Sequence, residues 1–459
     1  MRLYEINTRA HCRNFGEISD SELAELSRLG FDAVWLMGVW QISDGARKIS
    51  KITSPDFEGS PYAVPAYEVN RELGGKAQFA RLVKRARAVG LSVIVDFVSN
   101  HMALDSPWIS RRPDWFVRSD PKVRNQSTNE FFLHKSGEAI AFGRDPYFPP
   151  WNDTAQLDYS SQALRARMIE VLKRISRYAD GVRCDMAMLL LNNIFERTWG
   201  ARVGMHPPEE YWSEVISAVR LQHPNVLLVA EVYWDLEWDL QQLGFDYCYD
   251  KRFYDRLEYD NAESVRQHLT AKLDYQDKLV RFIENHDEPR AAATFSPEKE
   301  RAAAVTMMTL PGAKLLYEGQ CEGRRVRPPV FLARRPVEPI DEDLRAFYEK
   351  LLAAVKDSGL PESEWQSCER MGWPDNSSYL NLVAWCWSQD EVRYVVIVNL
   401  SEYPSQARVQ LPWNDLAGRA WQLKDVLSGA LFERDGSELQ LQGLYVDLPA
   451  WRFHFLCFQ

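Results

Sequence analysis

Four apolar segments of this 459-residue chain each end in a cluster of polar side chains. The clusters are Asp96 to His101, Asp180 to Asp185, Ala230 to Trp234 and Glu284 to Glu288. Two carboxyl groups can cleave an acetal, because one attacks the acetal carbon while the other moves a proton. A single acid at the end of a strand is unremarkable, since acids are common on protein surfaces. Acids, an arginine and histidines that follow several strands instead indicate one shared site.

The elements that must position these clusters alternate between strand-like and helix-like patterns. We expect strands at Leu3–Asn7, Ala33–Met37, Ser92–Val98, Gly181–Ala187, Val226–Val232, Phe245–Tyr249, Leu279–Ile283 and Ala313–Tyr317. Between the first two strands, Ser19 and Glu22 form a capping box that opens a helix, and Gly30 ends it. Alternating β and α signals favour a parallel sheet, and eight such units predict an α/β fold of the closed (β/α)8 TIM-barrel type. In such a barrel the reactive groups follow the carboxyl ends of the strands.

Two stretches of the chain break this alternation. Residues 102–154 are irregular and rich in Pro, Trp, Phe and Asn. A structureless loop of that length is improbable in a compact domain, so we expect a small inserted domain after the third strand. Residues 361–459 show alternating runs broken by turn residues, which predicts a C-terminal antiparallel β-sandwich. The catalytic barrel would then comprise residues 1–101 and 155–360.

The four clusters resemble, in order and spacing, the four signature regions of the α-amylase family of glycoside hydrolases and transglycosidases. The family patterns are D-x-x-x-N-H, G-x-R-x-D, a lone Glu after an apolar strand, and N-H-D. Here they correspond to Asp96 to His101, Gly181 to Asp185, Glu231, and Asn285 to Asp287. The segment from Gly59 to Val64 is also similar to the family's loop that supplies a tyrosine platform. Each motif alone is weakly specific, but together they form a strong signature that spans the whole chain.

This resemblance implies catalytic roles for Asp185, Glu231 and Asp287. Asp185 would be the nucleophile that forms a covalent glycosyl-enzyme, and Glu231 the general acid/base, a task that an apolar, partly enclosed site would suit. Asp287 would be a third carboxylate that grips the hydroxyls of the distorted sugar ring. Arg183 precedes Asp185 by two residues, so the two side chains face the same way in a strand. Its fixed charge would keep Asp185 ionised and oriented.

The resemblance also implies a set of substrate contacts. The expected substrate-binding residues are Tyr62, Asp96, His101, Arg183 and His286. Structural alternatives remain open for them. Arg183 could pair with Asp180 or Asp158 in a structural bridge, and Tyr62 could be ordinary packing. Asp96 is the best suited of the set to orient its neighbours by hydrogen bonds.

The sequence departs from the family around a calcium site. Many α-amylases continue past the nucleophile with a Lys-His pair that helps place calcium, whereas Asp185 is followed here by Met186 and Ala187. The family site also uses the asparagine matching Asn100 and an aspartate before the fourth strand, where this chain has Gln156. Calcium needs six to eight oxygen ligands, and charged ligands strengthen its binding. We therefore expect no obligatory metal and no other cofactor.

The leading expectation is a retaining α-glycosidase that acts on α-glucosidic bonds of maltooligosaccharides or α-glucans. The alternative is an α-glucan transglycosidase or sugar isomerase on the same scaffold, which would move a glucosyl or maltosyl unit. A catalytically dead binding module would lack one of the three carboxylates, and all three are present. A metal-dependent barrel that used Asp96, His101 and Asp287 would instead lose its activity to a chelator.

Charge and composition bear on partners and compartment. The 55 basic and 65 acidic residues give a net charge of −10, which argues against binding nucleic acid or an anionic membrane. The segment Met1–Asn7 carries an acid where a signal peptide needs its apolar stretch. The seven cysteines are scattered and odd in number, which argues against a disulfide framework or structural zinc. We expect a cytoplasmic enzyme with a carbohydrate substrate, and no pattern indicates its oligomeric state.

Overall fold

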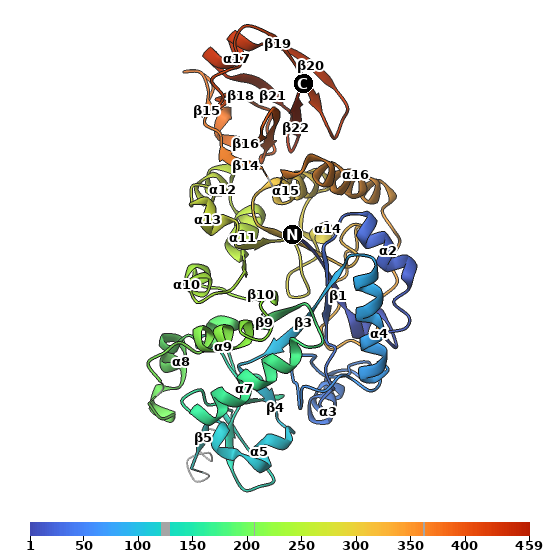
Figure 1. The fold of residues 1–459 in the computed structure, drawn as a ribbon, viewed down its shortest axis with the longest axis vertical. Coiled ribbons are helices and arrows are strands. Elements are labelled where there is room, and N and C mark those ends of the chain that lie inside the picture. Colours follow the sequence, from blue (N-terminus) through green and yellow to red (C-terminus); the bar gives the residue numbers. More distant parts are fainter. Residues whose placement is uncertain (121–128, 206, 361–362) are drawn as a thin grey trace. The chain divides into compact units, whose positions relative to one another are not determined.

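Eight parallel strands form a closed barrel in the order β1-β13-β12-β11-β10-β9-β3-β2. The strands are β1 (Arg2–Asn7), β2 (Ala33–Met37), β3 (Ser92–Val98), β9 (Gly181–Asp185), β10 (Leu227–Ala230), β11 (Tyr247–Tyr249), β12 (Leu279–Arg281) and β13 (Ala313–Tyr317). All eight strands expected from the sequence are present, and four of them are shorter than expected. This closed parallel barrel confirms the predicted TIM-barrel class. The computed structural model (Figure 1) describes residues 1–120, 129–205, 207–360 and 363–459.

The chain forms two compact units. Unit 2 contains residues 3–249 and 328–337, and unit 1 contains residues 1–2, 250–327 and 338–459. The polar clusters that follow β3, β9 and β10 thus belong to unit 2, and the cluster that follows β12 belongs to unit 1.

Several helices in the described part of unit 2 begin at a residue whose side chain caps the helix. The helices of this part are α1 (Thr8–His11), α2 (Asp20–Arg28), α3 (Asp44–Thr53), α4 (Gly75–Ala88), α5 (Pro107–Arg111), α7 (Gln162–Ile175), α8 (Asn192–Trp199), α9 (Tyr211–Arg220) and α10 (Glu237–Gln242). The hydroxyl of Ser19 accepts the backbone N–H of Glu22 at the start of α2, as the capping box predicts. Gly30 follows with a φ of 87°, a left-handed conformation that glycine adopts without strain.

The expected insert, residues 102–154, lies wholly within unit 2. Its short elements are β4 (His101–Ala103), which begins one residue earlier, α5, the 3-10 turn η1 (Pro113–Trp115), β5 (Arg118–Ser119), β6 (Phe131–Leu133) and β7 (Ala139–Ala141). β5, β7 and β6 form one small sheet, and β4 pairs antiparallel with β8 (Thr154–Gln156) where the insert ends. Residues 121–128 of the expected insert lie outside the described part of the chain.

The helices of unit 1 precede its terminal sheets. They are α11 (Lys251–Tyr259), α12 (Ala262–His268), α13 (Leu273–Gln276), α14 (Ala291–Thr294), α15 (Pro297–Thr309) and α16 (Glu342–Ser358). The sheets contain β14 (Glu364–Ser367), β15 (Arg370–Met371), β16 (Leu382–Gln389), β17 (Val392–Asn399), β18 (Ser405–Val409), β19 (Ala420–Asp425), β20 (Leu431–Asp435), β21 (Leu444–Leu448) and β22 (Phe453–Phe458), with α17 (Gly436–Gln442) between the last strands.

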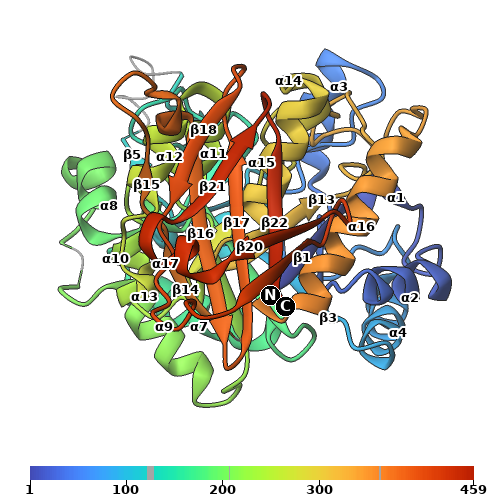
Figure 2. The ribbon, with the colours of Figure 1, turned by 90° about the horizontal axis from the view of Figure 1, so that it is seen from above.

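The terminal sheets form an antiparallel sandwich, as the sequence predicts. One sheet has the order β14-β16-β17-β22-β19-β20 and the other β15-β18-β21, and β16, β17 and β22 lie side by side in Figure 2. Buried side chains from both sheets share one core, among them Ala384, Val395, Ala407 and Val446. Residues 361–362, at the expected start of this domain, lie outside the described residues.

Trp385 and Trp387 extend from the opposite face of β16. Both indole N–H groups donate to the backbone oxygen of Thr309, at 3.1 and 2.8 Å, where α15 ends. Both rings are buried. They tie the sandwich to α15 rather than fill the space between the two sheets.

Candidate active site

One guanidinium group contacts two buried carboxyl groups in unit 2. Arg183 and Asp185 lie two residues apart on β9, so their side chains share a face, and Nη1 of Arg183 donates to Oδ1 of Asp185 at 2.6 Å. Nη2 of the same arginine lies 2.7 Å from Oε2 of Glu231, an ion pair that is not aligned as a hydrogen bond. The structure therefore brings the expected nucleophile and the expected acid/base onto one side chain.

A third acid holds this arginine from the neighbouring strand. Asp96 on β3 is directly opposite Arg183 in the parallel pairing, and its Oδ1 lies 3.5 Å from Nη1. The same carboxyl accepts the indole N–H of Trp35 at 3.2 Å and the backbone N–H of Gly38 at 3.4 Å. Asp96 is buried and bonded to the protein, so its contacts favour orienting Arg183 over touching a sugar.

Aromatic rings surround the arginine on its remaining sides. Its guanidinium lies 5.1 Å from the ring centroid of Trp35, 5.3 Å from that of Tyr62 and 5.8 Å from that of Tyr249. Burial alone would lower the pKa of Arg183, but the charge of Glu231, with those of other groups, raises this pKa well above its ordinary value. The arginine is thus a permanent positive charge between the acids.

Glu231 accepts hydrogen bonds on both carboxyl oxygens. Tyr233 donates its hydroxyl to Oε1 at 2.8 Å, and the backbone N–H of Met186 donates to Oε2 at 2.6 Å. The backbone of Glu231 is fixed too, because its N–H donates to Cys184 O and its C=O accepts from Ala187 N. The sequence suggested an apolar enclosure here, whereas the structure surrounds this carboxyl with polar donors.

The cluster is largely withdrawn from solvent. Asp185 is 5% exposed and Glu231 is 3% exposed. Charged groups in such surroundings interact strongly, because little water screens them. The arrangement suits chemistry in which charge develops at one point and must be stabilised by fixed groups.

His101 and Tyr62 lie next to one another in the same unit. The buried imidazole of His101 is hydrogen-bonded to the backbone of Tyr62, and its ring centroid lies 5.2 Å from that of Trp151. Burial lowers the pKa of His101 to about 4. Its ring is therefore neutral at ordinary pH and is available for hydrogen bonds.

His286 and Asp287 follow β12 in unit 1. Nε2 of His286 lies 3.0 Å from Oδ2 of Asp287, and the histidine is buried while the carboxyl side chain is 41% exposed. Asn285 shapes the turn, because its Oδ1 accepts the backbone N–H groups of Asp287 and Glu288 at 2.8 and 2.9 Å. The Asp287 carboxyl is therefore accessible from solvent while it contacts His286.

The residues at the family's calcium position do not fit a cation. Nε2 of Gln156 donates to the backbone oxygen of Asn100 and to its Oδ1, each at 3.0 Å. Both oxygens that would face a metal therefore already accept N–H groups. Within the described residues, no three acidic, histidine or cysteine side chains gather as a metal site.

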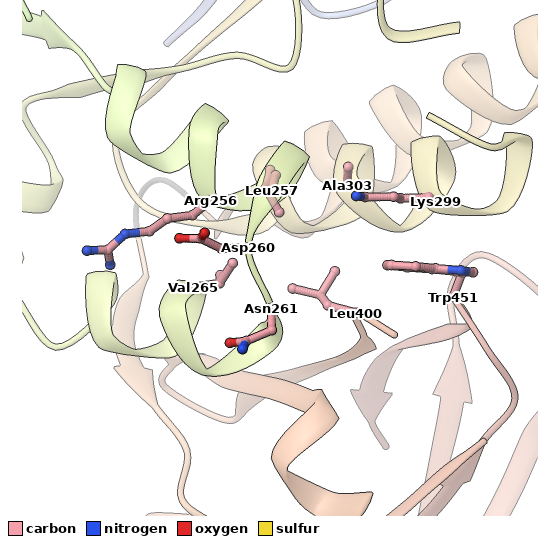
Figure 3. Close-up of a pocket in the computed structure, with 9 residues that line it drawn as sticks. All are labelled: Arg256, Leu257, Asp260, Asn261, Val265, Lys299, Ala303, Leu400 and Trp451. Atoms are coloured by element: carbon pink, nitrogen blue, oxygen red, sulfur yellow. The ribbon is translucent and has the colours of Figure 1, made fainter. Parts of the chain in front are cut away.

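A small pocket in unit 1 contains none of the expected site residues (Figure 3). It is lined by Arg256, Leu257, Asp260, Asn261, Val265, Lys299, Ala303, Leu400 and Trp451. Its amine, Lys299 Nζ, donates to Glu258 O at 2.9 Å and lies 5.4 Å from the Trp451 ring centroid. Arg256 is likewise bonded to Ser264 O at 2.6 Å. These bonds are internal, so the pocket's cationic groups are engaged with the protein itself.

Sequence reasoning missed several members of the cluster. Trp35 and Tyr249 lie in apolar strand patterns that give no sign of a role beside an arginine. Tyr233 could have been recognised as a hydrogen-bond donor to Glu231, since side chains two residues apart in an extended segment face the same way. Met186 could not, because its role rests on a backbone N–H in a left-handed conformation that the residue type does not indicate.

These features define a (β/α)8-barrel protein with a buried carboxylate–guanidinium cluster at the ends of its strands. A model of the alpha-amylase catalytic domain matches residues 18–385. The chain belongs to this family.

Curated relatives and solved structures agree with that assignment. An alpha-amylase from Haloarcula japonica is 26% identical over 371 residues, which are 77% of this chain and 48% of the relative. This chain thus spans about half the length of that protein. An alpha-1,4-glucan:maltose-1-phosphate maltosyltransferase from Bifidobacterium longum is 26% identical over 213 residues, 44% of this chain and 24% of the relative. A maltogenic alpha-amylase from Thermotoga neapolitana superposes with a TM-score of 0.76 at 20% identity, covering 100% of this chain and 98% of the other.

The described residues include no helix that is both long enough and apolar enough to cross a lipid bilayer.

Proposed function

We propose that this protein is a retaining α-glycosidase that acts on α-glucosidic bonds of maltooligosaccharides or α-glucans. The observation that carries the proposal is the contact of one guanidinium, Arg183, with both Asp185 and Glu231. Retention at an acetal carbon requires two carboxyl groups about 5–5.5 Å apart. Both carboxyls contact terminal nitrogens of the same arginine, and this shared partner supports a joint role at one bond.

In the first step, Asp185 attacks the anomeric carbon while Glu231, in its acid form, gives its proton to the glycosidic oxygen. The bond from carbon to the leaving sugar breaks, and a bond from carbon to the Asp185 oxygen forms. Arg183 holds Asp185 in the orientation for attack. Tyr233 and Met186 hold the carboxyl of Glu231 in position as it loses its proton.

In the second step, the Glu231 carboxylate takes a proton from water as the water oxygen attacks the same carbon. The bond to Asp185 breaks, which restores both side chains and releases a sugar of the original anomeric configuration. Asp287, His101, His286 and Tyr62 contact the sugar, and Asp96 acts through Arg183. Asp287 lies in the segment that follows the carboxyl end of β12, and this supports the role because such barrels place reactive groups at that end of their strands.

A matched pair of substitutions tests the two roles. Asp185→Asn removes the nucleophile, so release of glucose from maltooligosaccharides and from α-glucosyl fluoride falls together. Glu231→Gln removes the acid, so release from maltooligosaccharides falls while fluoride, which departs without protonation, is still displaced in a first turnover. Equal release by Asp185→Asn and the wild type would refute the proposal.

The second candidate is transfer of the glucosyl or maltosyl unit to another sugar on the same scaffold. The maltosyltransferases among the relatives favour it. Incubation with single maltooligosaccharides separates the two, since a hydrolase gives only shorter chains and a transferase also gives longer ones. The stereochemistry, read by NMR in the first minutes, is retention in both cases.

The remaining expectations belong to this proposal. Residues 102–154 constitute a small domain inserted after the third strand, and residues 361–459 constitute a C-terminal β-sandwich domain. The enzyme works in the cytoplasm, which the scattered cysteines support. It needs no metal, and it binds neither nucleic acid nor a membrane.

A further inference from the structure

Three oxygen atoms converge on one amide nitrogen at the point where the insert begins and ends. Nε2 of Gln156 lies 3.0 Å from Asn100 O, 3.0 Å from Asn100 Oδ1 and 3.1 Å from Leu157 O. Asn100 returns a bond, because its Nδ2 donates to Oε1 of Gln156 at 3.3 Å. The arrangement is a closed amide–amide pair with two backbone oxygens, Asn100 O and Leu157 O, also on the donor side.

This pair is fully enclosed by protein. Asn100 is 1% exposed and Gln156 is 0% exposed. A buried oxygen without a donor costs about 1–3 kcal/mol, so oxygens gathered in such a place require either N–H groups or a cation. Here the two amide hydrogens of Gln156 and the backbone N–H of Leu157, which donates to Asn100 O, supply donors for the three oxygens.

The Asn100–Gln156 amide pair lies where the two ends of the insert meet. Gln156 is the last residue of β8 and pairs with His101, the first residue of β4, so the two ends of the insert meet at this point. Leu157 N donates to Asn100 O, and Val117 N donates to Gln156 O. Nδ2 of Asn100 also lies 3.4 Å from Nδ1 of His101. The amide pair therefore holds the ends of the insert beside a proposed sugar contact.

We propose that the side-chain amide of Gln156 takes the place of a cation at this junction and closes the insert without a metal. A cation at the centre of these oxygens would have to displace the amide. It would then find only neutral ligands, whereas calcium binds tightly where carboxylates contribute charge. This inference extends the metal independence stated in the proposed function to the residue that provides it, and its readout, thermal unfolding, does not depend on what the enzyme cleaves.

Thermal unfolding with calcium alone as the probe tests the proposal. The wild-type midpoint is expected to be the same in excess chelator and in millimolar calcium. Gln156→Asp puts a carboxylate against the three oxygens, so its midpoint falls by several degrees in chelator and recovers on addition of calcium, with one ion bound per chain by elemental analysis. Gln156→Leu keeps the volume but removes the donors, so its midpoint falls in both conditions.

Gln276 provides a matched control in unit 1. It is another fully buried glutamine, and its Nε2 donates to a single backbone oxygen, Ala271 O, at 3.2 Å. Gln276→Asp is therefore expected to gain no response to calcium. The proposal is overturned if chelator lowers the wild-type midpoint, if calcium fails to restore Gln156→Asp, or if Gln276→Asp responds to calcium as strongly as Gln156→Asp does.

Discussion

The backbone N–H of Met186 donates to Oε2 of Glu231 across 2.6 Å, although the two residues are 45 positions apart. Met186 reaches this position with φ 43° and ψ 47°, the left-handed conformation that a residue with a Cβ seldom adopts. It is also the residue directly after Asp185, so one strained peptide links the two proposed catalytic carboxyls. Strain of this kind costs about 1–3 kcal/mol and persists where the surroundings hold it.

The kcat of Met186 variants is expected to depend on how readily the new residue adopts the left-handed backbone conformation with a free N–H to donate. Met186→Pro loses the N–H and fixes φ near −65°, so kcat should fall by about 10²-fold or more, the range that a positioned acid contributes. Met186→Val keeps the N–H but disfavours the left-handed region, so its kcat should fall less. Met186→Gly adopts that region freely and should keep kcat near the wild-type value.

Steady-state kinetics on one maltooligosaccharide, with circular dichroism to verify folding, provides the measurement. The order Gly, Val, Pro in falling kcat is the signature of a role through the backbone. If Met186→Gly were as impaired as Met186→Pro, the side chain and not the N–H would matter.

Substitutions at Arg183 are expected to separate charge from geometry. Arg183→Lys keeps the positive charge, but an ammonium cannot place two parallel nitrogens on Asp185 and Glu231, so kcat should fall about 10²-fold while the fold survives. Arg183→Met removes the cation that contacts three buried acids. Removing one partner of a buried ion pair costs about 3–5 kcal/mol, so this variant should also lose stability. Melting curves and kcat measured together test both expectations, and an Arg183→Lys variant with wild-type kcat would contradict the first.

The barrel could be predicted because its signals are local. Each strand is a short apolar run, and the start of α2 is marked by Ser19 and Glu22, three residues apart. The pairing of Asp185 with Arg183 could also be predicted, since both lie on one face of one strand. What the sequence does not show are contacts that depend on backbone conformation or on meetings between distant segments. The N–H of Met186 and the amide of Gln156 are of this kind, and so is the cage of Trp35 and Tyr249 around Arg183.

Glu300 is expected to make stability depend on pH. This residue of α15 is buried, and burial, with the charge of Glu284, raises its pKa from 4.5 to about 8. The folded protein then keeps a proton that the unfolded chain releases between pH 4.5 and 8, so this group's contribution to stability is complete below pH 4.5 and is lost as the pH rises towards 8. Its slope is at most about 1.4 kcal/mol per pH unit.

Glu300→Gln carries a neutral amide at every pH and should lack that slope. Urea unfolding at several pH values across this window, for the wild type and the variant, provides the comparison. If the free energy of unfolding fell with rising pH equally in the wild type and in Glu300→Gln, Glu300 would not be the group that holds the proton.

His101 is expected to make stability depend on pH with the sign opposite to that of Glu300. Its pKa is lowered from 6.5 to about 4 by burial, so the unfolded chain binds a proton between these values that the folded protein refuses. The contribution of His101 to the free energy of unfolding is complete above pH 6.5 and is lost as the pH falls towards 4. In the folded enzyme the ring stays mostly neutral down to about pH 5, so its hydrogen bonds to a sugar should not change with pH above that value. NMR of enzyme labelled at its eight histidines tests this, with His101→Asn to assign the signal. The His101 resonance should keep its neutral chemical shift down to about pH 5, and a midpoint near 6.5 would mean that the imidazole is open to water and is not held in the site.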